Sequence, residues 1–255
     1  MNNNQNMMWI FTFIVALATL VAGLMGYFVP DGAVAPAAQP VAQAPAPAPT
    51  PNPTPAPTPT PTPAPAATSI AVSELNEFYE TAYIQWNEDA AVTVIEFTDT
   101  QCPFCARHAS NNTLAQVVET YNGDVNVVTA HFPLSFHPLA QDGWEAMECA
   151  AEQNGGAEAY YAMKDAMFEL GANPTEENIR LAATNAWFDA DAIMDCVDAD
   201  TYAQKVRDQM AFGRQLGVTG TPGNIVIDND TGEFTKVSWA VPAAAFDSAI
   251  NQYLN

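Results

Sequence analysis

A proline-rich stretch limits where this chain can fold. Residues 30–67 consist mainly of Pro, Ala and Thr and contain hardly any large apolar side chains. Such a segment cannot bury a hydrophobic core, and it favours the extended polyproline II conformation. At about 3.1 Å per residue it would form a disordered linker with a reach of roughly 100 Å. Any globular domain must therefore lie in residues 68–255, which are enough for a single buried core.

An uncharged apolar run precedes this linker. Residues 9–29 read WIFTFIVALATLVAGLMGYFV and are long enough to span a bilayer as a helix. A cleaved signal peptide usually has a positive region before a shorter apolar core, whereas residues 1–8 contain no Lys or Arg. We therefore predict that residues 1–29 form a short tail and a transmembrane anchor. A cleaved signal, or a buried helix of a soluble protein, is the alternative.

The charge of the chain restricts its partners. Acidic residues outnumber basic ones by 29 to 7, for a formal net charge of −22, and Asp31 is the only acid before residue 68. Such a surface repels nucleic acid, which binds through basic contacts, so no nucleic-acid partner is expected. We interpret the acidic residues as a solubilising shell, with an acidic docking face as the alternative.

Apolar patterning predicts a mixed α/β domain from residue 68 onward. The β-branched runs at 91–98 (AVTVIEFT) and 125–132 (VNVVTAHF) predict two buried strands with a helical stretch between them. Residues 138–216 indicate several successive helices, one of which starts near residue 173 with Asn173 as its cap. The other expected elements are a helix near 72–82, a hairpin of strands at 224–228 and 233–240, and a closing helix near 242–254.

A Cys-x-x-Cys pair directly follows the first predicted strand. Cys102 is expected to be exposed at a helix N-terminus, where unpaired backbone N–H groups and the helix dipole favour a thiolate. Pro103 suits the first helical position, which does not need its missing N–H. Cys105, one turn further, would be shielded and suited to resolving a mixed disulfide. The spacing therefore predicts a redox pair in which Cys102 reacts with the substrate and Cys105 closes the cycle.

Two other interpretations of this pair remain open. Cys-x-x-Cys is also half of a zinc site, and Cys102, Cys105 and His108 could hold a metal ion, although no second such motif follows. A purely structural disulfide is the other alternative. We favour redox chemistry, for which no metal and no other cofactor is expected.

Two features elsewhere in the chain fit redox chemistry. Glu96 lies within the buried run, six residues before Cys102, where a carboxylate is costly unless it has a role or a partner. Burial favours its protonated form, so Glu96 could exchange protons with the cysteines through water. A strand-end Glu that reaches solvent is the alternative. Thr221 and Pro222 precede a predicted strand and suit a tight turn with a cis peptide bond, in which the Thr221 backbone could pair with a bound peptide.

Three separate blocks of the sequence resemble a known family. VTVIEFTDTQCPFC, HFPLSFHPLAQDGWEAMECAAEQ and LGVTGTPGNIVID look like successive blocks of the DsbA-like thiol:disulfide oxidoreductases. The likeness covers roughly residues 88–255 and implies an α/β thioredoxin fold with a helical insertion. It also implies that Cys102 is the nucleophile, Cys105 the resolving thiol, Glu96 the buried acid and Pro222 the cis-proline.

One position departs from that family's best-known oxidase, which has Pro-His between its cysteines where this chain has Pro-Phe. Phe104 cannot donate a hydrogen bond or a charge to the Cys102 thiolate. The protein is therefore expected to be a weaker oxidant than that enzyme. Together with Thr221 and Pro222, Phe104 is expected to contact the substrate.

The remaining cysteines, Cys149 and Cys196, lie in separate predicted helices of the insertion with small and apolar neighbours. We predict a structural disulfide between them, and the alternatives are two free buried thiols or a second redox relay. His131 and His137 flank a Pro-containing turn and are expected to be packed or capping residues. Asp99 is interpreted as a loop carboxylate near the pair, without an assigned role.

Together these features predict a thiol:disulfide oxidoreductase anchored in the cell membrane by a single span, with its domain on the extracytoplasmic side. We expect it to introduce disulfides into cysteine-containing exported proteins and to be reoxidised by a membrane redox partner. A disulfide reductase or isomerase of the same fold is the alternative, and so is a non-catalytic metal carrier that uses Cys102 and Cys105.

Overall fold

A computed structural model of the chain describes residues 68–254. The predicted tail and anchor (1–29) and the predicted linker (30–67) lie outside the described residues. Between residues 68 and 254, none of the helices combines the length and the apolarity that a bilayer span requires.

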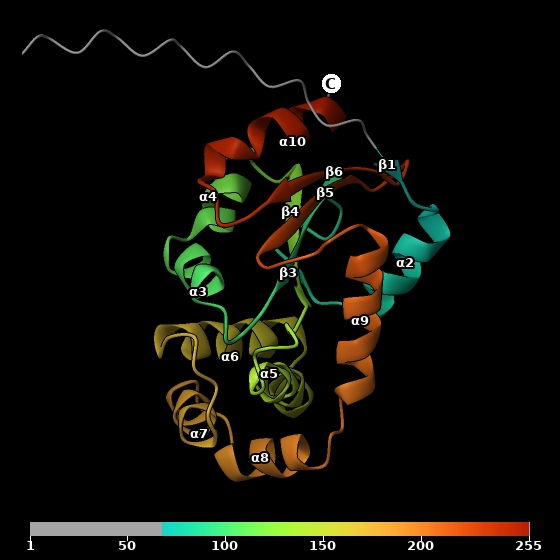
Figure 1. The fold of residues 1–255 in the computed structure, drawn as a ribbon. Helices are drawn as coiled ribbons and strands as arrows, with labels where there is room; N and C mark the ends of the chain where they lie inside the picture. Colours follow the sequence, from blue (N-terminus) through green and yellow to red (C-terminus); the bar gives the residue numbers. More distant parts are fainter. Residues whose placement is uncertain (1–67, 255) are drawn as a thin grey trace, which may run out of the picture. The chain divides into compact units, whose positions relative to one another are not determined.

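A mixed β-sheet runs through the described part of the chain (Figure 1). Its six strands lie in the order β1-β6-β5-β3-β4-β2. Their bounds are Thr68–Ser69 (β1), Ile84–Gln85 (β2), Val92–Thr98 (β3), Val125–His131 (β4), Gly223–Asp228 (β5) and Glu233–Ser238 (β6). Strands β3 and β4 are parallel, and β5 is antiparallel to both β3 and β6. The predicted pair of buried strands with a helical connection and the predicted hairpin are therefore both present.

Helices cover both faces of the sheet. Because side chains alternate along a strand, Val92 and Val94 of β3 pack with α4 (Thr113–Thr120) and α10 (Asp247–Tyr253) on one face. On the other face, Ile95 and Phe97 pack with α2 (Val72–Thr81) and α9 (Ala203–Gln215). This alternation places Glu96 on the same face as Val94.

Successive helices fill the segment between β4 and β5. They are α5 (Ala140–Asn154), α6 (Ala157–Glu169), α7 (Glu176–Asn185), α8 (Ala190–Asp198) and α9. The first four surround a separate apolar core that includes Trp144, Met147, Tyr160, Met163, Ile179 and Ile193. Figure 1 shows α5 to α8 grouped beyond one end of the sheet. A disulfide between Cys149 of α5 and Cys196 of α8 joins two of these helices.

The structure corrects three local expectations. Helix α7 begins at Glu176, and its cap is Thr175 rather than Asn173, because the Thr175 hydroxyl accepts a hydrogen bond from the backbone of Asn178 at 3.3 Å. The helical stretch after the cysteines is two helices, α3 (Pro103–Ser110) and α4, separated at Asn112, whose φ of 51° is left-handed. The closing segment begins with a 3₁₀ turn, η1 (Ala243–Ala245), before α10.

Candidate active site

Cys102 is the N-cap residue of α3, and Pro103 is the first residue of that helix, as expected. The expectation that Cys102 is exposed is wrong, since the side chain is only 3% exposed. Two distant segments cover it. Its Sγ lies 3.6 Å from the carbonyl oxygen of Thr221, and the cysteine pair packs against Phe168 of α6. Residues close in sequence do not bury the N-terminus of a helix. The burial of Cys102 therefore depends on how the insertion and the Pro222 loop pack against it.

Both thiols are free, and their pKa values are shifted in opposite directions. Hydrogen bonding from the Cys105 thiol is the main reason why the pKa of Cys102 falls to about 5. Burial opposes this shift, while the Thr221 side chain and the backbone N–H groups of Phe104 and Cys105 support it. Burial raises the pKa of Cys105 far above its usual range, and the charges of Cys102 and Glu96 add to the effect. At neutral pH the reduced pair therefore consists of a Cys102 thiolate and a Cys105 thiol.

Glu96 is buried in β3 and has a specific partner. The residue is 6% exposed, and its Oε1 lies 2.6 Å from Nδ1 of His108, a residue of α3 that is 2% exposed. From the sequence, His108 was considered only as a possible metal ligand, and its pairing with Glu96 was not predicted. The available signal was the spacing, because a histidine three residues after Cys105 projects from the same face of the helix.

The alternative metal site is not assembled. Among the residues that the structure describes, no group of three or more His, Cys, Asp or Glu side chains is placed to hold a metal ion. His108 directs Nδ1 to Glu96 instead of joining Cys102 and Cys105 in such a group.

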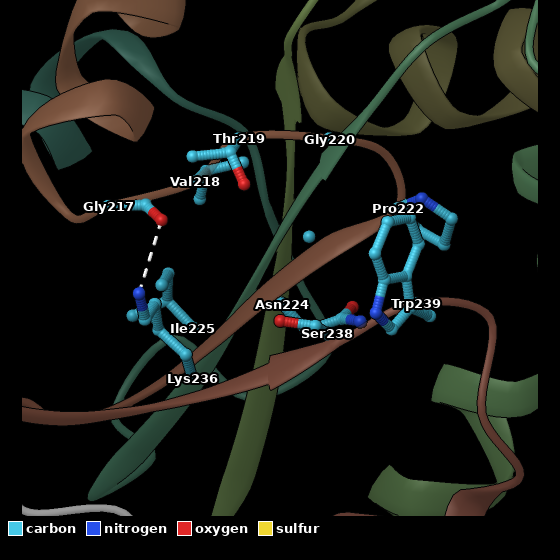
Figure 2. Close-up of a pocket in the computed structure, with 11 residues that line it drawn as sticks. Gly217, Val218, Thr219, Gly220, Pro222, Asn224, Ile225, Lys236, Ser238 and Trp239 are labelled. Carbon is cyan, nitrogen blue, oxygen red and sulfur yellow. Dashed lines mark hydrogen bonds between the residues drawn. The ribbon is translucent and has the colours of Figure 1, made fainter.

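The Thr221-Pro222 peptide bond is cis. A pocket of about 70 Å³ lies beside this loop (Figure 2). It is lined by residues 217–220 and 222–225 together with Lys236, Ser238 and Trp239. Figure 2 shows the indole of Trp239 at the Pro222 end of the pocket. The backbone N–H of Trp239 donates to the carbonyl oxygen of Pro222 at 3.0 Å, and the side chain is 66% exposed.

Phe104, inside the cysteine motif, is also an exposed aromatic side chain, at 52%. The guanidinium group of Arg107 lies 5.1 Å from its ring centroid. Trp239 was not singled out from the sequence. Its signal was a large aromatic residue directly after a strand, which is not specific enough to indicate a site.

Asp99, to which no role was assigned, organises the loop before Cys102. Its buried carboxylate accepts hydrogen bonds from the backbone of Gln101 and of Leu134, both at 2.7 Å, and lies 2.9 Å from Nδ1 of His137. The carbonyl oxygen of Asp99 also accepts the N–H of Cys102 at 3.1 Å. One residue therefore ties the cysteine motif to the loop that follows β4.

His131 is buried, in agreement with its expected packing role, and its Nε2 lies 2.6 Å from Oε1 of Glu148. The other carboxylate oxygen of Glu148 accepts from Lys205 Nζ at 2.6 Å. Burial lowers the pKa of His131. Although burial opposes it, the contacts with His131 and Lys205 lower the pKa of Glu148. These contacts join β4, α5 and α9.

Comparison with known proteins identifies the fold and the family. A family model described as thioredoxin matches residues 80–252. DsbA2 of Pseudomonas aeruginosa has a similar structure, at 26% identity and a TM-score of 0.56, covering 66% of this chain and 92% of that chain. BdbD of Bacillus subtilis is similar at 18% identity and a TM-score of 0.59, covering 69% and 94% of the two chains. The thiol-disulfide exchange protein alpha-DsbA2 of Wolbachia pipientis is similar at 19% identity and 0.57, covering 71% and 94%.

Among curated proteins, the likeness is confined to short segments. The Na(+)/H(+) antiporter NhaA 1 of Mycolicibacterium gilvum is 36% identical over 75 residues, which are 29% of this chain. The Na(+)/H(+) antiporter NhaA 3 of Salinispora tropica is 34% identical over 84 residues, or 32% of this chain. The chain spans 12% of the length of each of these relatives.

Proposed function

This chain belongs to the thioredoxin family and is a DsbA-like thiol:disulfide oxidoreductase, and from that premise we propose that it introduces disulfides into exported proteins. The observation that carries the oxidising direction is the pKa of Cys102, lowered to about 5. Stabilising the thiolate favours the reduced form of the enzyme, and an enzyme with a favoured reduced form is a stronger oxidant. The Pro-Phe dipeptide lowers the expected oxidising strength less than the sequence suggested. Cys105 is the main source of stabilisation of the Cys102 thiolate, and Phe104 contributes its backbone N–H.

The proposed cycle starts from the Cys102–Cys105 disulfide. A substrate thiolate attacks Cys102 Sγ, the bond between the two enzyme sulfurs breaks, and Cys105 leaves and takes up a proton. A second substrate thiolate then attacks the substrate sulfur of the mixed disulfide and releases Cys102 as a thiolate. The substrate loses two electrons and the enzyme gains them. The low pKa of Cys102 makes it a good leaving group in the second step.

Substrate contact is proposed at the two segments that meet beside Cys102. Phe104 belongs to the cysteine motif, and the backbone N–H of Trp239 is hydrogen-bonded to the carbonyl oxygen of Pro222. Both exposed rings therefore belong to segments that lie around the reactive sulfur. Aromatic side chains contribute large apolar contact areas to recognition surfaces. An extended peptide with a cysteine could pair with the Thr221 backbone while its side chains contact these rings.

The membrane context is part of the same proposal. The uncharged run at residues 9–29 supports an anchor, and residues 30–67 support a long linker on the extracytoplasmic side. The anchor would keep the domain near a membrane redox partner that removes its electrons. Fractionation of cells that express a chain without residues 9–29 tests the anchor.

A redox titration of the full chain in detergent tests the proposed direction. The protein is equilibrated in glutathione buffers, and the states of Cys102 and Cys105 are determined by thiol alkylation and mass, with Cys149 and Cys196 mapped separately. We expect a reduction potential nearer to about −120 mV than to about −270 mV. A value near or below the lower figure would make the protein a reductase or isomerase. A pair that never equilibrates would exclude redox catalysis.

A further inference from the structure

The pocket beside the Pro222 loop carries a positive charge in an otherwise acidic protein. Its one ionisable lining residue is Lys236 of β6, and no Asp or Glu lines it. Four other pockets of the described domain each have at least one carboxylate in their lining. In a chain whose formal net charge is −22, a concave site lined by a cation alone attracts anionic groups. We call it the Lys236 pocket.

The Lys236 ammonium group is held at one end of this pocket. Its Nζ donates a hydrogen bond to the carbonyl oxygen of Gly217 at 3.2 Å, which is the dashed line in Figure 2. Gly217 has a φ of 78°, a left-handed conformation that favours glycine, and a Cβ at this position would lie 2.9 Å from Nζ. Glycine therefore permits the turn and also leaves the space that the ammonium group occupies.

The ammonium group keeps donors for a ligand. It has three N–H groups, of which Gly217 accepts one. Between residues 68 and 254, no ion pair includes Lys236. Thr219 and Ser238 add two exposed hydroxyl groups to the lining. These are donors that a carboxylate can use, and a charged acceptor makes such hydrogen bonds stronger.

Trp239 forms the end of the pocket at Pro222, opposite Lys236 (Figure 2). Its φ of 76° is unusual for a bulky residue. The Trp239 N–H donates to the carbonyl oxygen of Pro222 at 3.0 Å, and its own carbonyl oxygen accepts from Val241 at 2.9 Å. The indole lies over Gly220, where a Cβ would be 3.7 Å from the ring. Strained backbone that its surroundings enforce is found at functional sites.

The Lys236 pocket is close to the reactive sulfur. Gly220 and Pro222 line it, and the carbonyl oxygen of Thr221 between them lies 3.6 Å from Cys102 Sγ. An extended peptide advances about 3.3 Å per residue, so the neighbours of a cysteine bound at Cys102 are within reach of the pocket. One water needs about 10–15 Å³ of cavity. The volume of about 70 Å³ therefore has room for a group of several heavy atoms, such as a carboxylate.

We propose that the Lys236 pocket binds an acidic side chain near the cysteine of a substrate, so that the protein favours cysteines with a neighbouring Glu. The carboxylate accepts hydrogen bonds from Lys236, and the CH₂ groups of the side chain lie against the indole of Trp239. Glu fits better than Asp, because the ammonium group lies at the end of the pocket away from Pro222. The inference rests on the proposed function and specifies its substrate class.

Paired peptides test this preference. Dithiol peptides that differ only by Glu or Gln, placed in turn at each position within about three residues of one cysteine, compete for the oxidised full chain in detergent. Acid quenching and chromatography give the ratio of their kcat/KM values. The peptide termini are blocked, so the Glu side chain is the only added carboxylate. At the best position we expect the Glu peptide to be oxidised about fivefold faster, the upper end for an exposed ion pair, with an Asp peptide in between. Equal oxidation of both peptides at every position would overturn the proposal.

Variants separate the pocket from the total charge of the protein. Lys236→Met should abolish the preference for Glu, and Lys236→Arg should keep it. Arg207→Met, which removes one positive charge from an exposed position of α9, should retain the preference of the parent protein. Comparing ratios between variants cancels the effect of Glu on the peptide thiol itself. An equal loss in Lys236→Met and Arg207→Met would assign the preference to net charge and overturn the role of the pocket.

Charge reversal gives a positive result that a damaged fold cannot produce. Lys236→Glu should favour a peptide with Lys in place of Glu, whereas Arg207→Glu should not. Trp239→Ala should slow the Glu and Gln peptides alike, because both side chains have the same CH₂ groups. A Lys236→Glu variant that still favours the Glu peptide would overturn the ion pair. Unchanged rates in Trp239→Ala would overturn the contact with the indole.

The same samples separate this inference from the proposed function. The competition is run in both directions, with oxidised protein and dithiol peptides and with reduced protein and disulfide peptides. A preference for Glu at a reduction potential typical of a reductase would support the Lys236 pocket and refute the oxidising direction. A high potential without a preference for Glu would refute the pocket alone.

Discussion

Cys102 and Cys105 are chemically identical side chains that their surroundings make different. Cys102 caps α3, and Cys105, Thr221 and the backbone N–H groups of Phe104 and Cys105 lower its pKa to about 5. Cys105 lies one turn inside the helix, where burial has the opposite effect. The asymmetry that a two-step disulfide exchange requires is therefore produced by one turn of helix and one loop.

The pH dependence of Cys102 alkylation should report this difference. In the reduced protein, the rate of alkylation by iodoacetamide should be constant at neutral pH and fall with a midpoint near pH 5. A denatured control should show the ordinary midpoint of about 8.5. Peptide mass spectrometry identifies the modified cysteine. A midpoint for Cys102 equal to that of the denatured control would contradict the prediction.

The same shift affects the stability of the reduced protein. A thiol whose pKa is depressed on folding contributes stability that is fully present above its unfolded pKa and is lost as the pH falls through its folded pKa. For Cys102 this window extends from about 8.5 down to about 5, with a slope of up to about 1.4 kcal/mol per pH unit.

At the scale of elements, the disulfide links two helices of the insertion that are far apart in the sequence. Cys149 of α5 and Cys196 of α8 are separated by 47 residues, and both helices contribute to the insertion core. Cys149 is buried, and Cys196 is half-buried against the insertion core. These observations favour a structural role over a second redox relay.

Removal of this disulfide should affect stability and not redox chemistry. The double variant Cys149→Ala/Cys196→Ala should lose about 4 kcal/mol of unfolding free energy, as expected for a loop of this length. Urea denaturation monitored by circular dichroism measures the loss. The reduction potential of Cys102 and Cys105 should stay that of the parent protein. A changed potential with unaltered stability would indicate that the two pairs exchange electrons.

At the scale of the whole molecule, the chain combines a described domain with an N-terminal part that lies outside the described residues. The domain contains the cysteine pair, the acid and the cis-proline loop within one fold. We therefore expect redox chemistry to require only this domain, and the proposed membrane location to depend on residues 1–67.

Deletion of residues 9–29 should separate these two properties. The full chain should sediment with membranes after an alkaline carbonate wash, because a spanning helix is not released by it. The deleted chain should be found in the soluble fraction, with an unchanged reduction potential in vitro. Recovery of a mature protein whose mass lacks the N-terminal residues would instead show a cleaved signal peptide.

Local sequence patterns determined much of this domain. The β-branched runs predicted β3 and β4, and the position of Cys102-Pro103-Phe104-Cys105 after β3 predicted the start of α3, because periodicity and capping depend on residues that are close in the chain. The pairing of Cys149 with Cys196 was also predicted, since they were the two cysteines outside the motif and lay in separate predicted helices of the insertion with small and apolar neighbours.

The tertiary structure decided which groups meet. Cys102 is covered by Thr221, 119 residues away, and by Phe168, so its burial could not be read from a helix N-terminus. Glu96 was predicted to be buried, but its partner His108 lies on another element. A strand pattern specifies which side chains face the core, whereas the residue that meets each of them depends on the packing of segments that are distant in the chain.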